Sequence, residues 1–141
     1  MIISTKGRYI LRVMIDLVER CDDGYVPMKD VAERQEISLK YLEKILPILT
    51  KNDIIEGVHG KGGGYRLTRK PEEYSVGEIL RLTEGDLAPV ACLEGDPKPC
   101  GRTAECRTFP MWQKFTNMMN EFFDGITIAD LMRDEFADEM V

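Results

Sequence analysis

The chain has 141 residues, of which 43% are hydrophobic and 31% are charged, and its formal net charge is −6. This length suits one domain, or one domain with an extension, and the apolar content excludes wholesale disorder. No stretch approaches the roughly 20 apolar residues of a membrane span, and the N-terminus lacks the apolar block of a secretory signal. We therefore expect a cytoplasmic protein that does not enter a membrane.

The acidic net charge conceals an uneven distribution along the chain. Lys and Arg outnumber Asp and Glu by eight to four in residues 34–70, whereas Asp and Glu outnumber them by thirteen to six in residues 76–141. A basic patch on an acidic chain can still attract a polyanion, with the acidic part facing away from it. The distribution therefore keeps nucleic-acid binding open.

Helical spacing defines the first two predicted elements. Residues 6–20 place apolar side chains three or four positions apart, at Ile10, Val13, Met14, Leu17 and Val18. The run at residues 22–24, Asp-Asp-Gly, ends this helix. A shorter helix is predicted for residues 27–35, with Pro27 in its first turn and an inner face made of Met28, Val31 and Ala32.

A third helix is predicted for residues 39–52, with Ser38 as its N-cap. Its inward face is expected to be Leu39, Leu42, Ile45, Leu46 and Leu49, and its outward face Lys40, Tyr41, Glu43, Lys44 and Lys51. Pro47 lacks a backbone donor, so we expect it to kink this helix or to split it near its end.

Two short strand patterns follow, at residues 54–58 and 64–68, joined by a glycine-rich loop. Two helices linked by a tight turn and followed by a hairpin predict a winged helix-turn-helix, in a fold that is mainly α with a minor β part. A further helix is predicted for residues 76–84, capped by Ser75 and ended by Gly85.

The remainder combines a cysteine-bearing loop with an apolar helix. Residues 86–109 are predicted to be the loop and contain Cys92, Cys100 and Cys106. Helix 111–124 carries a broad apolar stripe: Met111, Trp112, Phe115, Met118, Met119, Phe122 and Phe123. The stripe is wider than a lone helix can hide, which favours burial against a second copy of the chain over packing on its own first helix.

Several motifs together resemble one family. They are STKGRY near the start, ISLKYLEKIL in the third helix, GKGGGYRL in the wing, SVGEIL after it, and three cysteines before the tryptophan-bearing helix. Over roughly residues 1–132 the chain resembles the bacterial winged-helix regulators that include the iron–sulfur sensor IscR, the nitric-oxide sensor NsrR and the cysteine-metabolism repressor CymR. The resemblance implies a dimeric transcription factor and not an enzyme.

The resemblance also implies a division of the chain. Residues 1–85 would form the winged helix-turn-helix DNA-binding domain, residues 86–109 the cluster loop, and residues 110–141 the dimerisation helix and C-terminal tail. The expected partners are double-stranded DNA with a near-palindromic operator and a second copy of the chain. Two recognition helices would then enter major grooves about one helical turn apart.

The predicted DNA contacts lie on the third helix and the wing. Lysines can reach phosphates, hydroxyls can donate hydrogen bonds, and a carboxylate in the major groove fits a cytosine amino group. Glycine amides in the wing allow close approach to the sugar-phosphate backbone. The predicted contacts are Lys6, Ser38, Lys40, Tyr41, Glu43, Lys44, His59, Gly60, Lys61, Gly62, Gly63, Gly64, Tyr65 and Arg66.

The glycine-rich loop, GKGGGYRL, is not a nucleotide-binding loop. A P-loop needs Ser or Thr directly after its lysine and then a helix, whereas here Gly62 follows Lys61 and a strand follows the loop. His59 stands where the relatives often carry arginine, and we expect it to contact DNA and not a metal.

The three clustered cysteines are the candidate metal ligands. Thiolates suit iron–sulfur clusters or zinc, and the wide spacing here lacks the tight C-x₂-C pairs of structural zinc sites. With the resemblance this favours a 2Fe–2S cluster on Cys92, Cys100 and Cys106. Cys21, at the end of the first helix, is expected to be a half-buried structural thiol.

The fourth cluster ligand stays open. Cluster sensors of the family usually carry a histidine three residues after the last cysteine, a position held here by Phe109. The acidic ligand that nitric-oxide sensors borrow from near residue 8 of the partner subunit has no counterpart, since this chain has Arg8 there. The candidates are Glu94, Asp96, Glu105, a partner-subunit residue or a small thiol.

Three functional hypotheses result. The first is a homodimeric regulator, expected to be a repressor, that senses iron–sulfur status, redox stress or nitrosative stress through the cluster. The second is a cluster-free regulator of cysteine or sulfur metabolism that acts through a partner protein or through thiol oxidation. The third is an iron–sulfur carrier or redox protein, which predicts no salt-dependent affinity for DNA.

Overall fold

A computed structural model describes residues 3–95 and 100–133. Its elements, in chain order, are α1 (Thr5–Glu19), α2 (Met28–Gln35), α3 (Leu39–Lys51), β1 (Ile55–Val58), β2 (Gly64–Leu67), α4 (Val76–Glu84), α5 (Phe109–Asp124) and α6 (Ile128–Leu131). The predicted fold class is confirmed: helices dominate, and β1 and β2 form a two-stranded antiparallel sheet. None of the described helices is long and apolar enough to cross a membrane.

Serine caps begin three of the helices. Ser4 accepts a hydrogen bond from the Gly7 amide at the start of α1, and Ser38 and Ser75 do the same for α3 and α4. Each serine oxygen satisfies one of the amides that have no partner within the helix. The two caps predicted from the sequence, Ser38 and Ser75, are therefore confirmed.

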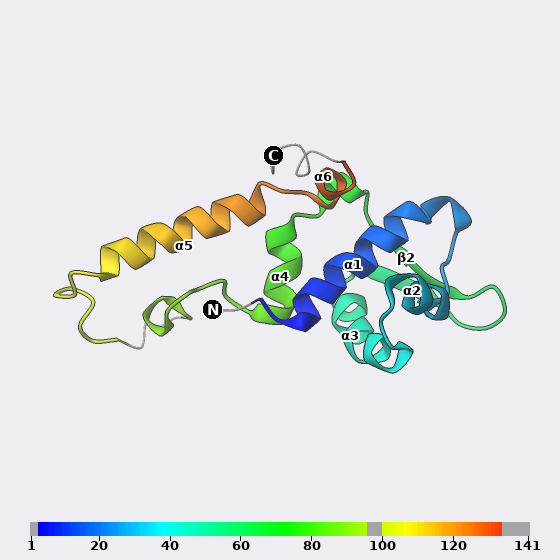
Figure 1. Ribbon diagram of the computed structural model, residues 1–141, viewed down its shortest axis with the longest axis horizontal. Coiled ribbons are helices and arrows are strands. Elements are labelled where there is room, and N and C mark those ends of the chain that lie inside the picture. The colour runs from blue at the N-terminus through cyan, green and yellow to red at the C-terminus, as the bar shows by residue number, and fades with distance from the viewer. Residues whose placement is uncertain (1–2, 96–99, 134–141) are drawn as a thin grey trace.

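The core forms around α1, which crosses the centre of the winged-helix part (Figure 1). Ile10, Val13 and Met14 of α1 are fully buried, in contact with the inner faces of α2 and α3. The same cluster takes in Tyr74, whose hydroxyl donates to the Ile54 carbonyl at 2.9 Å. The 3.6-residue spacing that predicts these helices is thus the spacing that fills the core.

The wing is pinned to the chain segment between α1 and α2. Ile55 pairs with Leu67 at one end of the hairpin, and Val58 pairs with Gly64 at the other. Val26 adds a bridge, because its amide and carbonyl exchange hydrogen bonds with Tyr65 at 2.8 and 2.9 Å. Gly64 makes this approach possible: its φ is 151°, and a Cβ there would lie 2.4 Å from the Val26 carbonyl.

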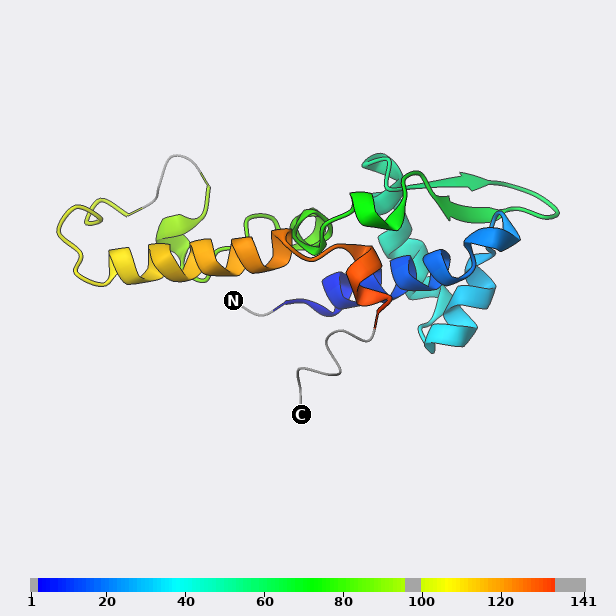
Figure 2. The same cartoon turned by 90° about the horizontal axis from the view of Figure 1, so that it is seen from above.

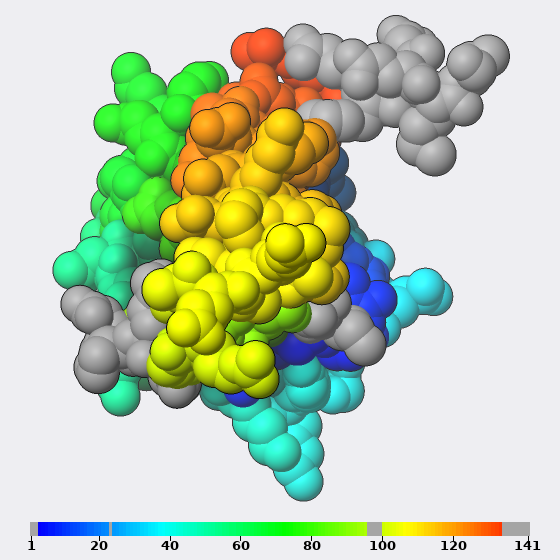
Figure 3. All heavy atoms as spheres, turned by 90° about the vertical axis from the view of Figure 1, so that its left-hand side faces the viewer, coloured from blue at the N-terminus to red at the C-terminus, as the bar shows by residue number. Residues whose placement is uncertain are grey.

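α5 extends away from the winged-helix part, and residues 86–95 and 100–108 lie on the same side (Figures 1 and 2). None of the side chains of α5 is fully buried. The space-filling view from that side shows α5 and the segment before it at the front of the molecule (Figure 3). α6, which the sequence analysis did not anticipate, returns the chain to the core through Ile128, which is fully buried.

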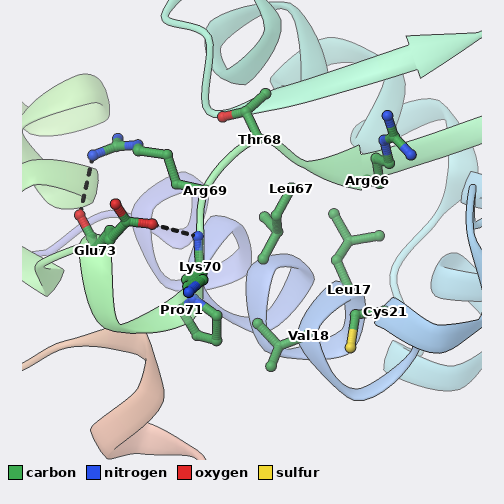
Figure 4. A pocket seen from close by; sticks show the side chains of 10 residues that line it. All are labelled: Leu17, Val18, Cys21, Arg66, Leu67, Thr68, Arg69, Lys70, Pro71 and Glu73. Atoms are coloured by element: carbon green, nitrogen blue, oxygen red, sulfur yellow. Dashed lines mark hydrogen bonds between the residues drawn. The ribbon is translucent and has the colours of Figure 1, made fainter.

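Two sequence-based expectations were wrong, and of the two alternatives for Pro47, a kink or a split of the helix, the split is excluded. Leu39 is 39% exposed, because side chains in a first helical turn project beyond the start of the helix. α3 continues through Pro47 to Lys51 without a split, supported by the buried side chains around it. Cys21 is exposed and not half-buried, because it follows the end of α1 and lies at the edge of a hollow of about 520 Å³ between α1 and β2 (Figure 4).

Candidate nucleic-acid interface and cysteine loop

The outward face of α3 carries the predicted reading residues. Lys40, Glu43 and Lys44 are exposed, whereas Leu42, Ile45 and the other inner residues are buried. Within the described residues none of these three charged side chains forms an ion pair. Two free cations flanking one free carboxylate can contact phosphates and a base edge at the same time.

Tyr41 is held by α1. Its ring packs edge-on against Tyr9, with ring centroids 5.5 Å apart. The guanidinium of Arg12 lies 5.2 Å from the centre of the Tyr9 ring and donates to the Gln35 side chain at 3.2 Å and to the Gln35 carbonyl. Consequently Tyr41 is half-buried and fixed by packing, while its hydroxyl end stays available as a polar group.

The wing tip holds the glycines and the single histidine. Gly60 and Gly62 lie at positive φ, and the Gly63 amide donates to the Gly60 carbonyl at 3.0 Å, which closes the turn. His59 and Lys61 are exposed. A hollow of about 460 Å³ lies between the wing and the end of α3, lined by Thr50, Gly57, Val58, His59, Gly60, Gly63, Gly64 and Tyr65.

Arg66 lies differently from the other predicted contacts. Its guanidinium donates to Glu56 at 2.5 Å and lies 4.6 Å from the centre of the Tyr25 ring. The hydrogen bond that Arg66 donates to Glu56 raises the pKa of Arg66 above its ordinary value. Arg66 is therefore engaged within the protein, and reaching DNA would require it to leave Glu56.

Lys6 lies in the first turn of α1 and is exposed. Tyr65 of β2 is half-buried and packs over Gly57, where a Cβ would lie 2.7 Å from the Tyr65 ring. Its role in the structure is thus to support the wing from beneath. The predicted DNA-contacting residues divide accordingly into an exposed set on α1, α3 and the wing tip, the half-buried Tyr41, and a supporting set at the base of the wing.

The cysteine loop keeps its thiols free. Cys92 is half-buried, Cys100 and Cys106 are exposed, and none of them forms a disulfide. Cys100 and Cys106 line one hollow of about 390 Å³ together with Arg102, Glu105, Arg107 and Thr108. Glu94 is exposed and outside this hollow, and Asp96 lies outside the described residues. Of the candidate acidic ligands, the structure brings only Glu105 beside two of the cysteines.

The surroundings of Cys106 lower the pKa of its thiol. The hydroxyl of Thr108 lies 3.3 Å from its sulfur, and hydrogen bonds from Thr108 and from the Phe109 amide, together with the charge of Arg102, lower the pKa of Cys106 below its ordinary value. The thiolate is the form that binds metals and reacts with oxidants. This end of the loop is therefore suited to either chemistry.

The donor set fits an iron–sulfur cluster in its chemistry, although the ligand sphere is not assembled. Three free thiols on one segment, one of them with a lowered pKa, are the ligands that such clusters take. Over residues 3–95 and 100–133, however, no three His, Cys, Asp or Glu side chains come close enough together to hold a metal ion.

α5 presents an uncovered apolar face beside this loop. Met111, Phe115, Met118 and Phe122 are between 48% and 59% exposed. They recur at intervals of four, three and four residues, which places them on a single stripe of the helix. Met119 and Phe123 pack instead toward α4, in the cluster of Val76, Leu80 and Leu87.

Several structurally important residues escaped the sequence analysis. Asp16 is 1% exposed and accepts from both Nε and Nη2 of Arg34, at 3.0 and 2.6 Å, and from Gln35 at 3.0 Å. Asp16 follows Val13 by three residues and so lies on the inner face of the helix, which could have indicated a buried carboxylate. Arg81, Asn120 and Asp124 join α4 to α5, and no spacing in the sequence indicated that contact.

A helix-turn-helix with a basic outward helix, followed by a glycine-tipped wing, defines a winged-helix transcription regulator. Residues 3–134 match the model of the Rrf2 family, described as an iron-dependent transcriptional regulator, and the chain belongs to this family. The predicted family is thereby confirmed, and family and fold are those of transcription regulators and not of enzymes.

The relatives include IscR and CymR, two of the three regulators named in the sequence analysis. The regulator IscR of Aliivibrio salmonicida is 35% identical over 132 residues, covering 94% of this chain and 77% of the relative. The solved structure of T. potens IscR matches with a TM-score of 0.76 at 34% identity. The match covers 100% of this chain and 93% of the IscR chain. The solved structure of CymR, the global cysteine regulator of B. subtilis, matches with a TM-score of 0.77 at 32% identity. The match covers 94% of this chain and 96% of the CymR chain.

Proposed function

We propose that this regulator is a cytoplasmic, homodimeric repressor that binds a near-palindromic operator and senses iron–sulfur status, redox stress or nitrosative stress through a 2Fe–2S cluster. One observation carries the proposal: a single chain joins an exposed basic helix and wing to three free thiols that directly precede an uncovered apolar helix. The basic helix and wing would contact DNA, the thiols would serve sensing, and the apolar helix would serve self-association.

The proposed DNA contacts follow from exposure and charge. α3 enters the major groove, where Lys40 and Lys44 neutralise phosphates and Glu43 accepts from a cytosine amino group. Ser38 and Tyr41 add hydroxyl contacts, and Lys6 reaches the backbone from α1. The wing tip lies along the neighbouring minor groove with His59, Lys61 and the glycine amides. Arg66 contributes only if it exchanges Glu56 for a phosphate.

Cys92, Cys100 and Cys106 would hold the cluster. A 2Fe–2S centre supplies a group that gains or loses electrons and reacts with oxidants or nitric oxide. Glu105 is the fourth ligand that the structure favours, since it lines the hollow shared by Cys100 and Cys106. Glu94, a residue of the partner subunit and a small thiol are the other candidates.

The test begins with protein purified without oxygen. Iron and acid-labile sulfide near two per chain, with visible absorbance that is lost when Cys92, Cys100 and Cys106 are replaced by alanine, is the expected result. Colourless, iron-free protein would contradict the cluster. A carboxylate ligand is examined separately with Glu105→Gln, for which Glu94→Gln is the matched control on the other half of the loop.

DNA binding is measured with the same preparations. Operator affinity should fall steeply with salt, by roughly 10³-fold or more between 50 and 200 mM, because several lysines displace counterions. A salt-independent affinity would contradict the proposed interface whatever the cluster content. The iron–sulfur carrier considered from the sequence is set aside because the chain belongs to a family of transcription regulators.

A cluster-free regulator is the second candidate, and two observations favour it. The described cysteines do not form a metal-binding group, and Cys106 is exposed with a lowered pKa, as a thiol that reacts directly with oxidants would be. The similarity to CymR, a cysteine regulator, is consistent with this alternative. It predicts that a mild oxidant changes operator affinity in iron-free protein, and that Cys106→Ser abolishes the change.

A further inference from the structure

The junction between α4 and α5 is held by one arginine. Arg81 donates through Nη1 to Asp124 Oδ1 at 2.7 Å and through Nη2 to Asp124 Oδ2 at 3.0 Å, and Nη2 also donates to Asn120 Oδ1 at 2.5 Å. A two-point guanidinium–carboxylate contact fixes orientation as well as distance. Gly77 leaves room for it, because a Cβ there would lie 2.0 Å from Asp124 Oδ1.

Asn120 extends this contact to the beginning of the cysteine loop. Its Nδ2 donates to the Leu87 carbonyl at 3.2 Å and to the Thr116 carbonyl at 2.8 Å. Leu87 is 2% exposed and lies five residues before Cys92, in the apolar cluster shared by α4 and α5. The side-chain amide of Asn120 therefore joins the loop to Arg81. Its NH₂ group donates to Leu87 at the start of the loop, and its carbonyl oxygen accepts from Arg81.

The last residue of α4, three positions after Arg81, is hydrogen-bonded to the start of α1. Glu84 Oε1 accepts from the Ser4 amide at 3.0 Å and from the Ser4 hydroxyl at 2.5 Å, and Ser4 is the N-cap of α1. α1 in turn holds Tyr41 of α3 through Tyr9. A movement of α4 is consequently passed to the helix that carries the proposed reading residues.

We infer that Asn120 and Arg81 are the residues through which the state of the cysteine loop changes DNA affinity. The inference rests on the proposed function and adds to it the contact that does the coupling. Asn120 has to keep its bonds to Leu87 and Arg81 at once, so displacement of the loop breaks one of them or moves α4. Without the Asn120 side chain, the loop and α4 respond independently of each other.

The first experiment compares operator affinity of the cluster-loaded and cluster-free forms of each variant. Coupling between two sites typically gives an affinity ratio of about 5- to 150-fold. In Asn120→Ala the affinity ratio of the two forms should move at least about threefold closer to one, because the variant loses one to two hydrogen bonds. Iron content should be unchanged, since the three cysteines are intact. Arg81→Lys should have the same effect, because an ammonium cannot make the two-point contact.

Asn117→Ala is the matched control. Asn117 is exposed on the same helix and makes no side-chain hydrogen bond to any described residue. In Asn117→Ala the ratio of operator affinities between the cluster-loaded and cluster-free forms should equal that of the unaltered protein. An unchanged ratio in Asn120→Ala overturns the inference, whereas loss of iron in every form, including the unaltered protein, is a failure of the proposed cofactor alone.

A second readout does not depend on a cluster. Because coupling is reciprocal, operator DNA should change amide hydrogen exchange in residues 86–95 of cluster-free protein. We expect this change in the unaltered protein and in Asn117→Ala, and its loss in Asn120→Ala. A full response in Asn120→Ala would overturn the inference even if the protein never binds iron.

Discussion

The charged residues of the proposed interface are not equivalent. Lys40 and Lys44 are exposed without an ion pair among the described residues, whereas Arg66 is hydrogen-bonded to Glu56. A free lysine reaches a phosphate at no cost in existing contacts, while Arg66 would first lose a charge-assisted hydrogen bond. The lysines of α3 should therefore contribute more to affinity than the arginine that follows the glycine loop.

Lys44→Ala tests this difference. Loss of one phosphate contact should weaken binding about equally for all operator sequences and reduce the slope of log affinity against log salt by about 1. Fluorescence anisotropy over a series of salt concentrations measures both quantities. Lys114→Ala on α5 is the control, because Lys114 is exposed but lies far from α3, and its salt slope should not change. Equal slopes for all three proteins would remove Lys44 from the interface.

Gly64→Ala tests the base of the wing. The substitution places a Cβ against the Val26 backbone at a φ of 151°, so it should destabilise the fold by about 2 kcal/mol or more and weaken DNA binding. Gly62→Ala is the comparison, since Gly62 also has positive φ but nothing within 4 Å of the added atom, and it should cost about 1 kcal/mol. Urea unfolding measures both, and equal losses would mean that the contact with Val26 has no role.

At the scale of the elements, the contact of α1 with α2 depends on one buried carboxylate. Burial alone would raise the pKa of Asp16, but the hydrogen bonds from Arg34 and Gln35 and the charge of Arg34 outweigh it and hold the pKa below its ordinary value. A buried ion pair whose partner is removed typically costs several kcal/mol. Asp16 therefore holds the end of α2, which precedes the reading helix, against α1.

Asp16→Asn should lower the free energy of unfolding by about 3 kcal/mol at pH 7. Because the folded pKa is depressed, the contribution of Asp16 is complete above the ordinary carboxyl pKa of about 4 and is lost as the pH falls below it. Urea unfolding of both proteins between pH 3 and pH 7 should show the difference shrinking only below about pH 4. A difference that stays constant down to pH 3 would contradict the role of the ionised carboxylate.

The sequence predicted the elements whose signals are local. Apolar spacing located α1 to α4, Ser38 and Ser75 marked two helix starts, and the glycines marked the wing. It missed α6, which is four residues long and is held by the long-range burial of Ile128. It also could not identify the partners of Arg66 and Arg81, because which of many carboxylates an arginine meets is decided by tertiary packing.

At the scale of the whole molecule, four of the six large hydrophobic side chains that are exposed in the described part lie on α5. These four residues lie on a single stripe, and Trp112 and Phe123 border it from partly buried positions. Exposed stripes of this kind usually mark an interface. A second copy of the chain would cover the stripe and would also set the spacing of two reading helices, for which grooves about 34 Å apart are required.

Phe115→Glu tests self-association. A carboxylate in the middle of the apolar stripe should convert a dimer to a monomer, because a charge buried between two helices has no partner. Sedimentation equilibrium gives the mass, and far-ultraviolet circular dichroism checks that α5 remains folded. Gln113→Glu adds the same charge to an exposed position on the opposite side of α5 and should leave the dimer intact. Dimers in both variants would place the interface elsewhere.

The bond between Arg81 and Asp124 lies at one end of α5, and the cysteine loop meets the helix at the other. α5 has 16 residues and therefore a length of roughly 24 Å. If α5 tilts as a rigid body about its contact with α4, a tilt of about 10° would displace its far end by about 4 Å. A small movement at the contact of Arg81 with Asp124 would then become a larger displacement of the residues just before α5, where Cys106 lies.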